Sequence, residues 1–146
     1  MRPWGKGPPM SYTLTVNNDL GIIVLRAKRS MSFDEIRLVL GEMVRLPEFR
    51  QGLCLVADFR GSGTALTGDD IRKLVDVAGR TDAAWGNTKW AFIASGDLMY
   101  GLSRMFVALT DTHQVTTHVF RSVEAADGWL DIGINVDEIL ARTPDD

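Results

Sequence analysis

The sequence predicts a single-domain α/β sandwich. About five strands form a mostly parallel sheet with an antiparallel strand at its amino-terminal edge, and about four helices surround the sheet. Two observations predict this class. Strand-like segments alternate with segments whose apolar residues recur at helical spacing, as in parallel sheets with crossover helices. Two strand-like segments, 53–57 (LCLVA) and 90–94 (WAFIA), are apolar throughout, as central strands covered on both faces are.

The domain begins with a predicted hairpin. Strand-like segments 12–16 and 22–27 flank the sequence Asn-Asn-Asp-Leu-Gly at 17–21, whose residues tolerate the positive φ of a tight turn. Ser32 and Glu35 have the spacing of a capping box, so the first helix is expected to start between them. Its predicted buried face consists of Ile36, Val39, Leu40 and Met43.

The later elements follow in order. Thr67 precedes Asp70 by three residues and predicts the start of a second helix. A third helix is expected at 98–109, after the strand 90–94. A strand at 115–120 (VTTHVF) passes directly into a fourth helix, and a short helix at 136–142 ends the chain. The residues expected to be buried by the fourth helix are Val123, Ala126, Trp129 and Leu130.

Composition limits the domain count and the partners. A length of 146 residues, 45% of them apolar, suits one domain and is short for two. The net charge of -3 gives no general attraction to nucleic acid or to anionic lipid. No segment reaches the length of a membrane span, and the one cysteine, Cys54, lies in an apolar run, so we predict a soluble cytoplasmic protein. Residues 1–10 are rich in proline and glycine and predict a flexible leader before a domain at 11–146.

These segments resemble the SpoIIAA-like family, which is related to the STAS domain of sulfate transporters and anti-sigma factor antagonists. The resemblance covers residues 11–132 and is carried by the hairpin, LCLVAD followed by FRG, WAFIAS, and VFRSVEAADGWL. It implies a small α/β domain without known catalysis, and some relatives are compared to lipid-binding CRAL-TRIO domains. In true anti-sigma factor antagonists, a serine in the loop after the central strand is phosphorylated. The resemblance makes Thr67 the matching candidate for phosphorylation, although a helix cap explains Thr67 more simply.

The strongest candidate binding site lies where two central strands end. The loops at 59–67 and 95–100 follow neighbouring parallel strands and therefore reach the same edge of the sheet. Both loops combine glycine with polar and apolar side chains, as an amphipathic ligand requires. The glycine-rich loop lacks the lysine of a phosphate-binding loop, so an ordinary flexible connection is the favoured explanation of the loop. The predicted ligand-binding residues are Phe59, Arg60, Ser62, Thr64, Ser95, Met99 and Tyr100. Neither Arg60 nor Tyr100 is assigned to the core.

Three functions are compatible with these residues. We favour a non-enzymatic binding or regulatory module that takes a small apolar or amphipathic ligand, or a protein partner, at the strand-end loops. The first alternative is a small hydrolase-like enzyme, with a site built from Asp58, Arg60, Ser62, Ser95 and Asp97. The second is an anti-sigma factor antagonist switched by phosphorylation of Thr67. His113 and His118 are isolated, so the sequence predicts no catalytic residue, metal site or cofactor.

The helix at 98–109 also predicts a homodimer. At about 100° per residue, one arc of this helix faces the sheet, whereas Tyr100 and Val107 project to the opposite side with Ser103 between them. The predicted sheet-facing residues are Leu102, Met105, Phe106 and Leu109. The second apolar patch predicts a dimer interface or an apolar pocket, and cover by loops or by the leader is the remaining alternative.

Overall fold

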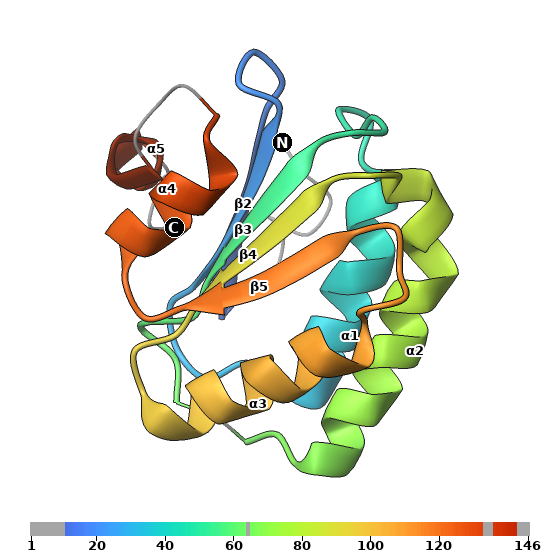
Figure 1. Ribbon diagram of the computed structural model, residues 1–146, viewed down its shortest axis with the longest axis vertical. Coiled ribbons are helices and arrows are strands. Elements are labelled where there is room, and N and C mark those ends of the chain that lie inside the picture. The colour runs from blue at the N-terminus through green and yellow to red at the C-terminus, as the bar shows by residue number, and fades with distance from the viewer. Residues whose placement is uncertain (1–10, 64, 133–135, 143–146) are drawn as a thin grey trace.

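The computed structural model describes residues 11–63, 65–132 and 136–142, and it confirms the predicted α/β class (Figure 1). One five-stranded sheet has the order β1-β2-β3-β4-β5. β1 pairs antiparallel with β2, and the other neighbours are parallel. The strands are β1 (Tyr12–Asn17), β2 (Ile22–Ala27), β3 (Cys54–Asp58), β4 (Lys89–Ile93) and β5 (Thr116–Phe120). The predicted leader at 1–10 lies outside the described residues.

The helices begin where the sequence predicts. Ser32 and Glu35 form a reciprocal capping box at the first helix, with hydrogen bonds of 3.1 and 3.0 Å. Thr67 and Asp70 form a second one, with hydrogen bonds of 3.2 and 3.0 Å. The helices are α1 (Phe33–Glu42), the short 3-10 helix η2 (Met43–Arg45), α2 (Gly68–Trp85), α3 (Asp97–Leu109), α4 (Val123–Leu130) and α5 (Val136–Arg142). None of the helices in the described ranges has the length and hydropathy needed to cross a bilayer.

The strand order determines which helix covers which face. From β2 to β5 each crossover moves one strand further in the same direction, so right-handed connections put α1, α2 and α3 on one face of the sheet. The chain reaches the other face only after β5, where α4 and α5 cover it (Figure 1). The result is three layers, with helices on both sides of the sheet.

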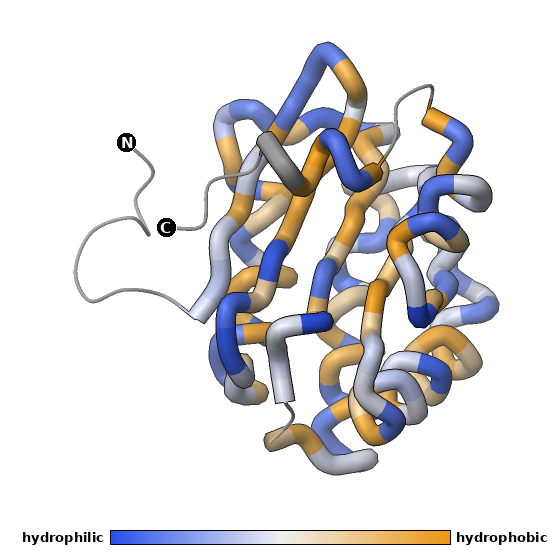
Figure 2. Tube along the Cα trace, turned by 90° about the vertical axis from the view of Figure 1, so that its left-hand side faces the viewer, coloured by the Kyte–Doolittle hydropathy of each residue, from blue (hydrophilic) through white to orange (hydrophobic). Residues whose placement is uncertain are grey.

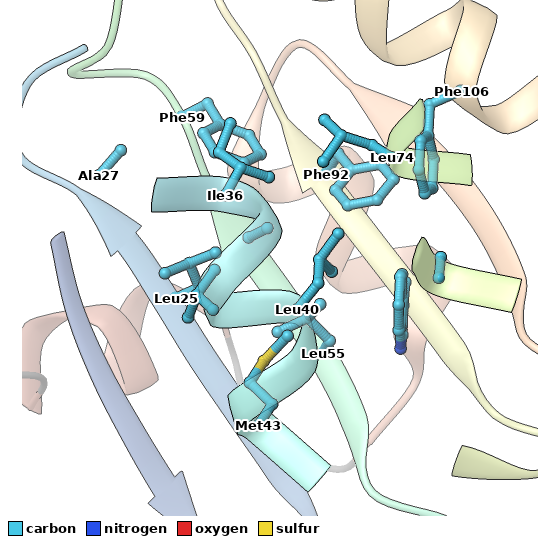
Figure 3. Close-up of a cluster of buried hydrophobic side chains, with 14 of the residues drawn as sticks. Leu25, Ala27, Ile36, Leu40, Met43, Leu55, Phe59, Leu74, Phe92 and Phe106 are labelled. Atoms are coloured by element: carbon cyan, nitrogen blue, oxygen red, sulfur yellow. The ribbon is translucent and has the colours of Figure 1, made fainter. Parts of the chain in front are cut away.

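Each face of the sheet has its own hydrophobic core, because side chains alternate along each strand. In β2, Ile23 and Leu25 pack under α1, α2 and α3, whereas Ile22 and Val24 pack under α4 and α5. β3 and β4 alternate in the same way, which explains why their sequences are apolar at every position. Figure 3 shows the larger core, and Figure 2 shows apolar segments running along the strands.

The buried face of α3 agrees only in part with the prediction: Phe106 is buried and Leu102 and Met105 pack partly buried against the larger core, but Leu109 is exposed. Leu98 and Leu109 are 64% and 42% exposed, whereas Tyr100 and Val107 pack partly buried against the larger core. Apolar residues cover more than half of this helix, so hydropathy alone could not select the side that meets the sheet. The residues that α3 buries are Met99, Ser103 and Phe106.

Trp129 is less buried than predicted. Val123, Ala126 and Leu130 form the buried face of α4, as expected. Trp129 is only half-buried and lies beside the edge strand β5, with its ring centroid 5.5 Å from that of Phe120. The indole is therefore at the margin of the core, not in its centre.

Candidate functional site

The predicted ligand-binding residues that the structure describes lie at the carboxyl edge of the sheet, but they separate into different groups. Phe59 and Met99 face the larger core, where they line a cavity. Ser95 and Tyr100 lie beside Arg121. Arg60 pairs with Asp58 on its own loop, and Thr64 lies outside the described residues.

The cavity lies between the sheet and the helices α1, α2 and α3, and its volume is about 50 Å³. Phe92 lies across from Phe59 and Phe106, with ring centroids 6.4 and 5.4 Å away (Figure 3). Of the described residues around the cavity, only Ser103 is polar. The lining residues are Leu25, Ile36, Val39, Leu40, Leu55, Ala57, Phe59, Leu66, Ile71, Leu74, Phe92, Met99, Ser103 and Phe106.

The cavity extends to the carboxyl edge of the sheet. Ile36 belongs to the first turn of α1, and Phe59 directly follows β3. Leu66 precedes the N-cap of α2, and Met99 belongs to the first turn of α3. These segments follow the carboxyl ends of parallel strands, so this end of the cavity lies beside the loops where the sequence predicted a ligand.

Arg121 forms a second cluster at this edge, and sequence reasoning missed it. Its Nη1 donates hydrogen bonds of 2.9 Å to Asp97 Oδ1 and 3.3 Å to the carbonyl oxygen of Ser95. The guanidinium also lies 4.1 Å from the ring centroid of Tyr100. Half of the Arg121 side chain is exposed. The cluster therefore holds a partly exposed cation in a fixed position.

The topology explains why Arg121 belongs to a candidate site. The chain leaves β4 toward α3 on one face of the sheet, and it leaves the neighbouring β5 toward α4 on the other face (Figure 1). Such a divergence of adjacent loops creates the crevice in which open α/β sheets bind ligands. The N-cap of α3, Gly96, supplies no side-chain hydrogen bond, so the first-turn N–H groups are left for solvent or a ligand. The signal in the sequence was the arginine directly after the last strand.

Arg60 is already engaged by a buried carboxylate. Asp58 is 3% exposed, and it accepts three hydrogen bonds of 3.0 Å from Arg60: two at Oδ1, from the backbone N and Nε, and one at Oδ2, from Nη2. Hydrogen bonding to Asp58 raises the pKa of Arg60. Both residues therefore stabilise the loop after β3, and neither side chain faces the apolar cavity as a lining residue.

The residues of the enzymatic alternative do not form a nucleophile–base pair within the described ranges. Ser62 Oγ donates a hydrogen bond of 2.7 Å to the neighbouring carbonyl oxygen of Gly63. Asp58 is held by Arg60, and His118 Nδ1 accepts a hydrogen bond from the backbone of Val119. His118 lies exposed on β5 rather than in the core.

Thr67 serves as the N-cap of α2. Its hydroxyl oxygen accepts the hydrogen bond from the Asp70 backbone, so modification of that oxygen would have to replace the cap. Phosphorylation of Thr67 stays a prediction.

No family profile matches this chain, and no curated protein matches it. A solved structure of an uncharacterized protein from the DUF3478 family of Shewanella loihica PV-4, described as having a SpoIIAA-like fold, does match. The alignment covers 86% of this chain and 99% of that chain, with 16% sequence identity and a TM-score of 0.50. At this identity the likeness shows the fold alone. The chain therefore has a SpoIIAA-like α/β fold, as the resemblance implied.

Proposed function

We propose that this domain is a non-enzymatic binding module for a small amphipathic anion. The apolar part of the ligand would enter the cavity, and its anionic end would bind at Arg121. The observation that carries the proposal is the apolar cavity of about 50 Å³ at the carboxyl edge of the sheet. The first turn of α3 connects the two regions, because Met99 lines the cavity and the adjacent Tyr100 lies against Arg121.

Arg121 can accept an anion although it already has partners. A guanidinium has five N–H donors, and the described contacts to Asp97 and Ser95 both use Nη1. Its ion pair with Asp97 is exposed, and such pairs contribute only about 0–1 kcal/mol. A carboxylate that brought its apolar chain into the cavity would therefore compete with Asp97 at little cost.

The cavity limits the size of the apolar part. It is smaller than the engineered cavity of roughly 150 Å³ that binds benzene in another protein, so it holds only the end of a short chain without movement of a helix. We therefore expect short aliphatic carboxylates to bind first. Longer chains would have to move α1 or α3 away from the sheet.

The test is a titration with hexanoate, octanoate and decanoate, followed by chemical shifts of the backbone amides. We expect the largest changes in amide chemical shift at Phe59, at Met99 and at Arg121. The variant Ser103→Leu, which fills the cavity, should abolish them. Shifts confined to another surface, or normal binding by a folded Ser103→Leu protein, would overturn the proposal.

A second variant isolates the anionic end of the ligand. Arg121→Gln should weaken octanoate binding about tenfold or more, since it removes a charge-assisted hydrogen bond, while 1-octanol binding stays unchanged. Arg104→Gln is the matched control, because Arg104 is an exposed arginine on α3 and does not belong to the Arg121 cluster. Equal weakening of octanoate by both variants would indicate a nonspecific charge effect and would count against binding at Arg121.

A further inference from the structure

A second concave surface lies away from the ligand cavity, between α1, η2 and the second half of α2. This surface, the α1–α2 groove, has a volume of about 390 Å³. Its lining residues are Arg37, Leu38, Gly41, Glu42, Val44, Arg45, Val77, Arg80 and Thr81. None of them was predicted to have a function, and none belongs to the cavity or to the Arg121 cluster.

The charge of the α1–α2 groove is opposite to that of the whole chain. Three arginines and one glutamate, Glu42, line it, whereas the chain carries a net charge of -3. Arg37 lies 3.7 Å from Asp34 in an exposed ion pair. Arg45 and Arg80 are exposed and form no ion pair with another residue in the described part of the chain. The groove therefore presents unpaired cations to an acidic partner.

The α1–α2 groove also contains three apolar side chains, Leu38, Val44 and Val77. Leu38 is 54% exposed, and Val44 and Val77 are partly buried against the larger core. Gly41 is an interior residue of α1, and a Cβ atom built there would meet nothing within 4 Å. No packing inside the monomer requires this glycine, although glycine weakens a helix interior. A glycine at this position does allow the side chains of a partner to approach the helix closely.

We propose that the α1–α2 groove docks an acidic amphipathic helix of another protein. An apolar ridge of that helix would pack on Leu38 and Gly41, and flanking carboxylates would pair with Arg37, Arg45 and Arg80. A helix fits a concave surface between two helices that contains both apolar and charged side chains better than a flat membrane does. Nucleic acid would leave the apolar side chains of the groove without a partner. This inference is independent of the proposed ligand.

The test uses a phage-displayed library of random peptides of about 14 residues, or about four helical turns. The library is selected on the full-length wild-type protein, and enriched peptides are synthesised and titrated by fluorescence anisotropy. We expect enriched sequences with apolar residues at helical spacing and flanking Asp or Glu. Their affinity should fall as salt rises toward about 1 M, where the Debye length is about 3 Å.

Two variants test the position of binding. Arg45→Glu with Arg80→Glu reverses the charge of the groove, and Gly41→Met places a large side chain in it. Each should weaken the peptides about tenfold or more. Arg72→Glu with Arg104→Glu is the control, because it changes the net charge equally at exposed positions outside the groove and should leave affinity unchanged. Circular dichroism and melting temperatures verify that all variants are folded.

Several results would overturn the proposal. Enriched peptides that are basic or lack an apolar ridge would do so, and so would peptides that bind the charge-reversed protein normally. Binding to vesicles of phosphatidylcholine and phosphatidylserine that is lost only in the charge-reversed variant would identify a membrane surface instead. A wild-type dimer that the charge reversal dissociates would identify a second copy of the chain.

Discussion

At the scale of single residues, Asp58 and Arg60 form an ion pair whose carboxylate is buried. The Asp58 carboxylate is buried at the end of β3, and both of its oxygens are bonded to Arg60. Arg60 was not assigned to the core from the sequence, because the pairing of its side chain with Asp58 depends on how the loop after β3 folds. The contacts of Arg60 now indicate that its replacement will cost stability.

We predict that Arg60→Ala lowers the free energy of unfolding by about 1–3 kcal/mol, because it leaves a buried carboxylate without its main partner. Urea denaturation measures the loss. Arg60→Lys should lose less, because it restores the charge without the bidentate geometry. A loss below about 0.5 kcal/mol for Arg60→Ala would mean that water replaces the guanidinium without cost.

Tyr12 gives a prediction about pH. Burial, and then repulsion by Glu35 and Glu42, raises the pKa of the Tyr12 phenol in the folded protein. Its neutral form therefore stabilises the fold fully below the ordinary tyrosine pKa of about 10, and this contribution is lost as pH rises through the higher folded value. Denaturation at pH values from about 8 to 11 should show a steeper alkaline loss of stability for the wild type than for Tyr12→Phe. Parallel curves would contradict the prediction.

At the scale of elements, the sequence predicted where the helices begin. It did not always predict which face of a helix is buried. The boxes at Ser32 and Thr67 depend on residues three positions apart, so the sequence contains the whole interaction. The orientation of α3 depends on packing against β5 and α2, which lie far away in the sequence. Apolar residues lie on several sides of α3, so the local sequence does not indicate which side packs against the sheet.

The helix α4 offers a comparison between neighbouring side chains. Leu130 is 4% exposed and packs in the smaller core, whereas Trp129 lies at its margin. Leu130→Ala should therefore cost about 2–5 kcal/mol, and Trp129→Ala about 1–2 kcal/mol, less than the roughly 3–5 kcal/mol typical of a core tryptophan. Guanidinium denaturation of both variants measures which substitution lowers the free energy of unfolding more. A larger loss for Trp129→Ala would show that its ring contacts with Phe120 and His118 contribute more than burial indicates.

At the scale of the whole molecule, the alternation of strands and helices was sufficient to predict the sheet. Strands and helices differ in the spacing of their apolar residues, so each can be recognised in the sequence. The right-handed crossover between parallel strands then limits how they can be connected. The candidate site was predicted only in part. The edge and the cavity residues Phe59 and Met99 were found, but the contact between Arg121 and Asp97 spans 24 residues and depends on the divergence of β4 and β5. The spacing of residues along the sequence does not predict such a long-range contact.

The predicted homodimer through α3 stays a prediction, but the structure changes the residues that should form it. Val107 packs against the core, so Val107→Glu would disturb the fold as well as any interface. Leu98 and Leu109 are the large exposed apolar residues of α3, and they lie about three helical turns apart on the same side. Burial of both against a second copy would remove this apolar surface from water.

We therefore predict that Leu98→Glu with Leu109→Glu gives a monomer, whereas the wild type sediments as a dimer at micromolar concentration. Both positions are exposed, so the free energy of unfolding measured on monomeric protein should change by less than about 0.5 kcal/mol. Leu38→Glu, at the exposed leucine of the α1–α2 groove, is the matched control and should leave the dimer intact. A wild type that stays monomeric at every concentration, or a dimer that only Leu38→Glu dissociates, would show that α3 is not the interface between subunits.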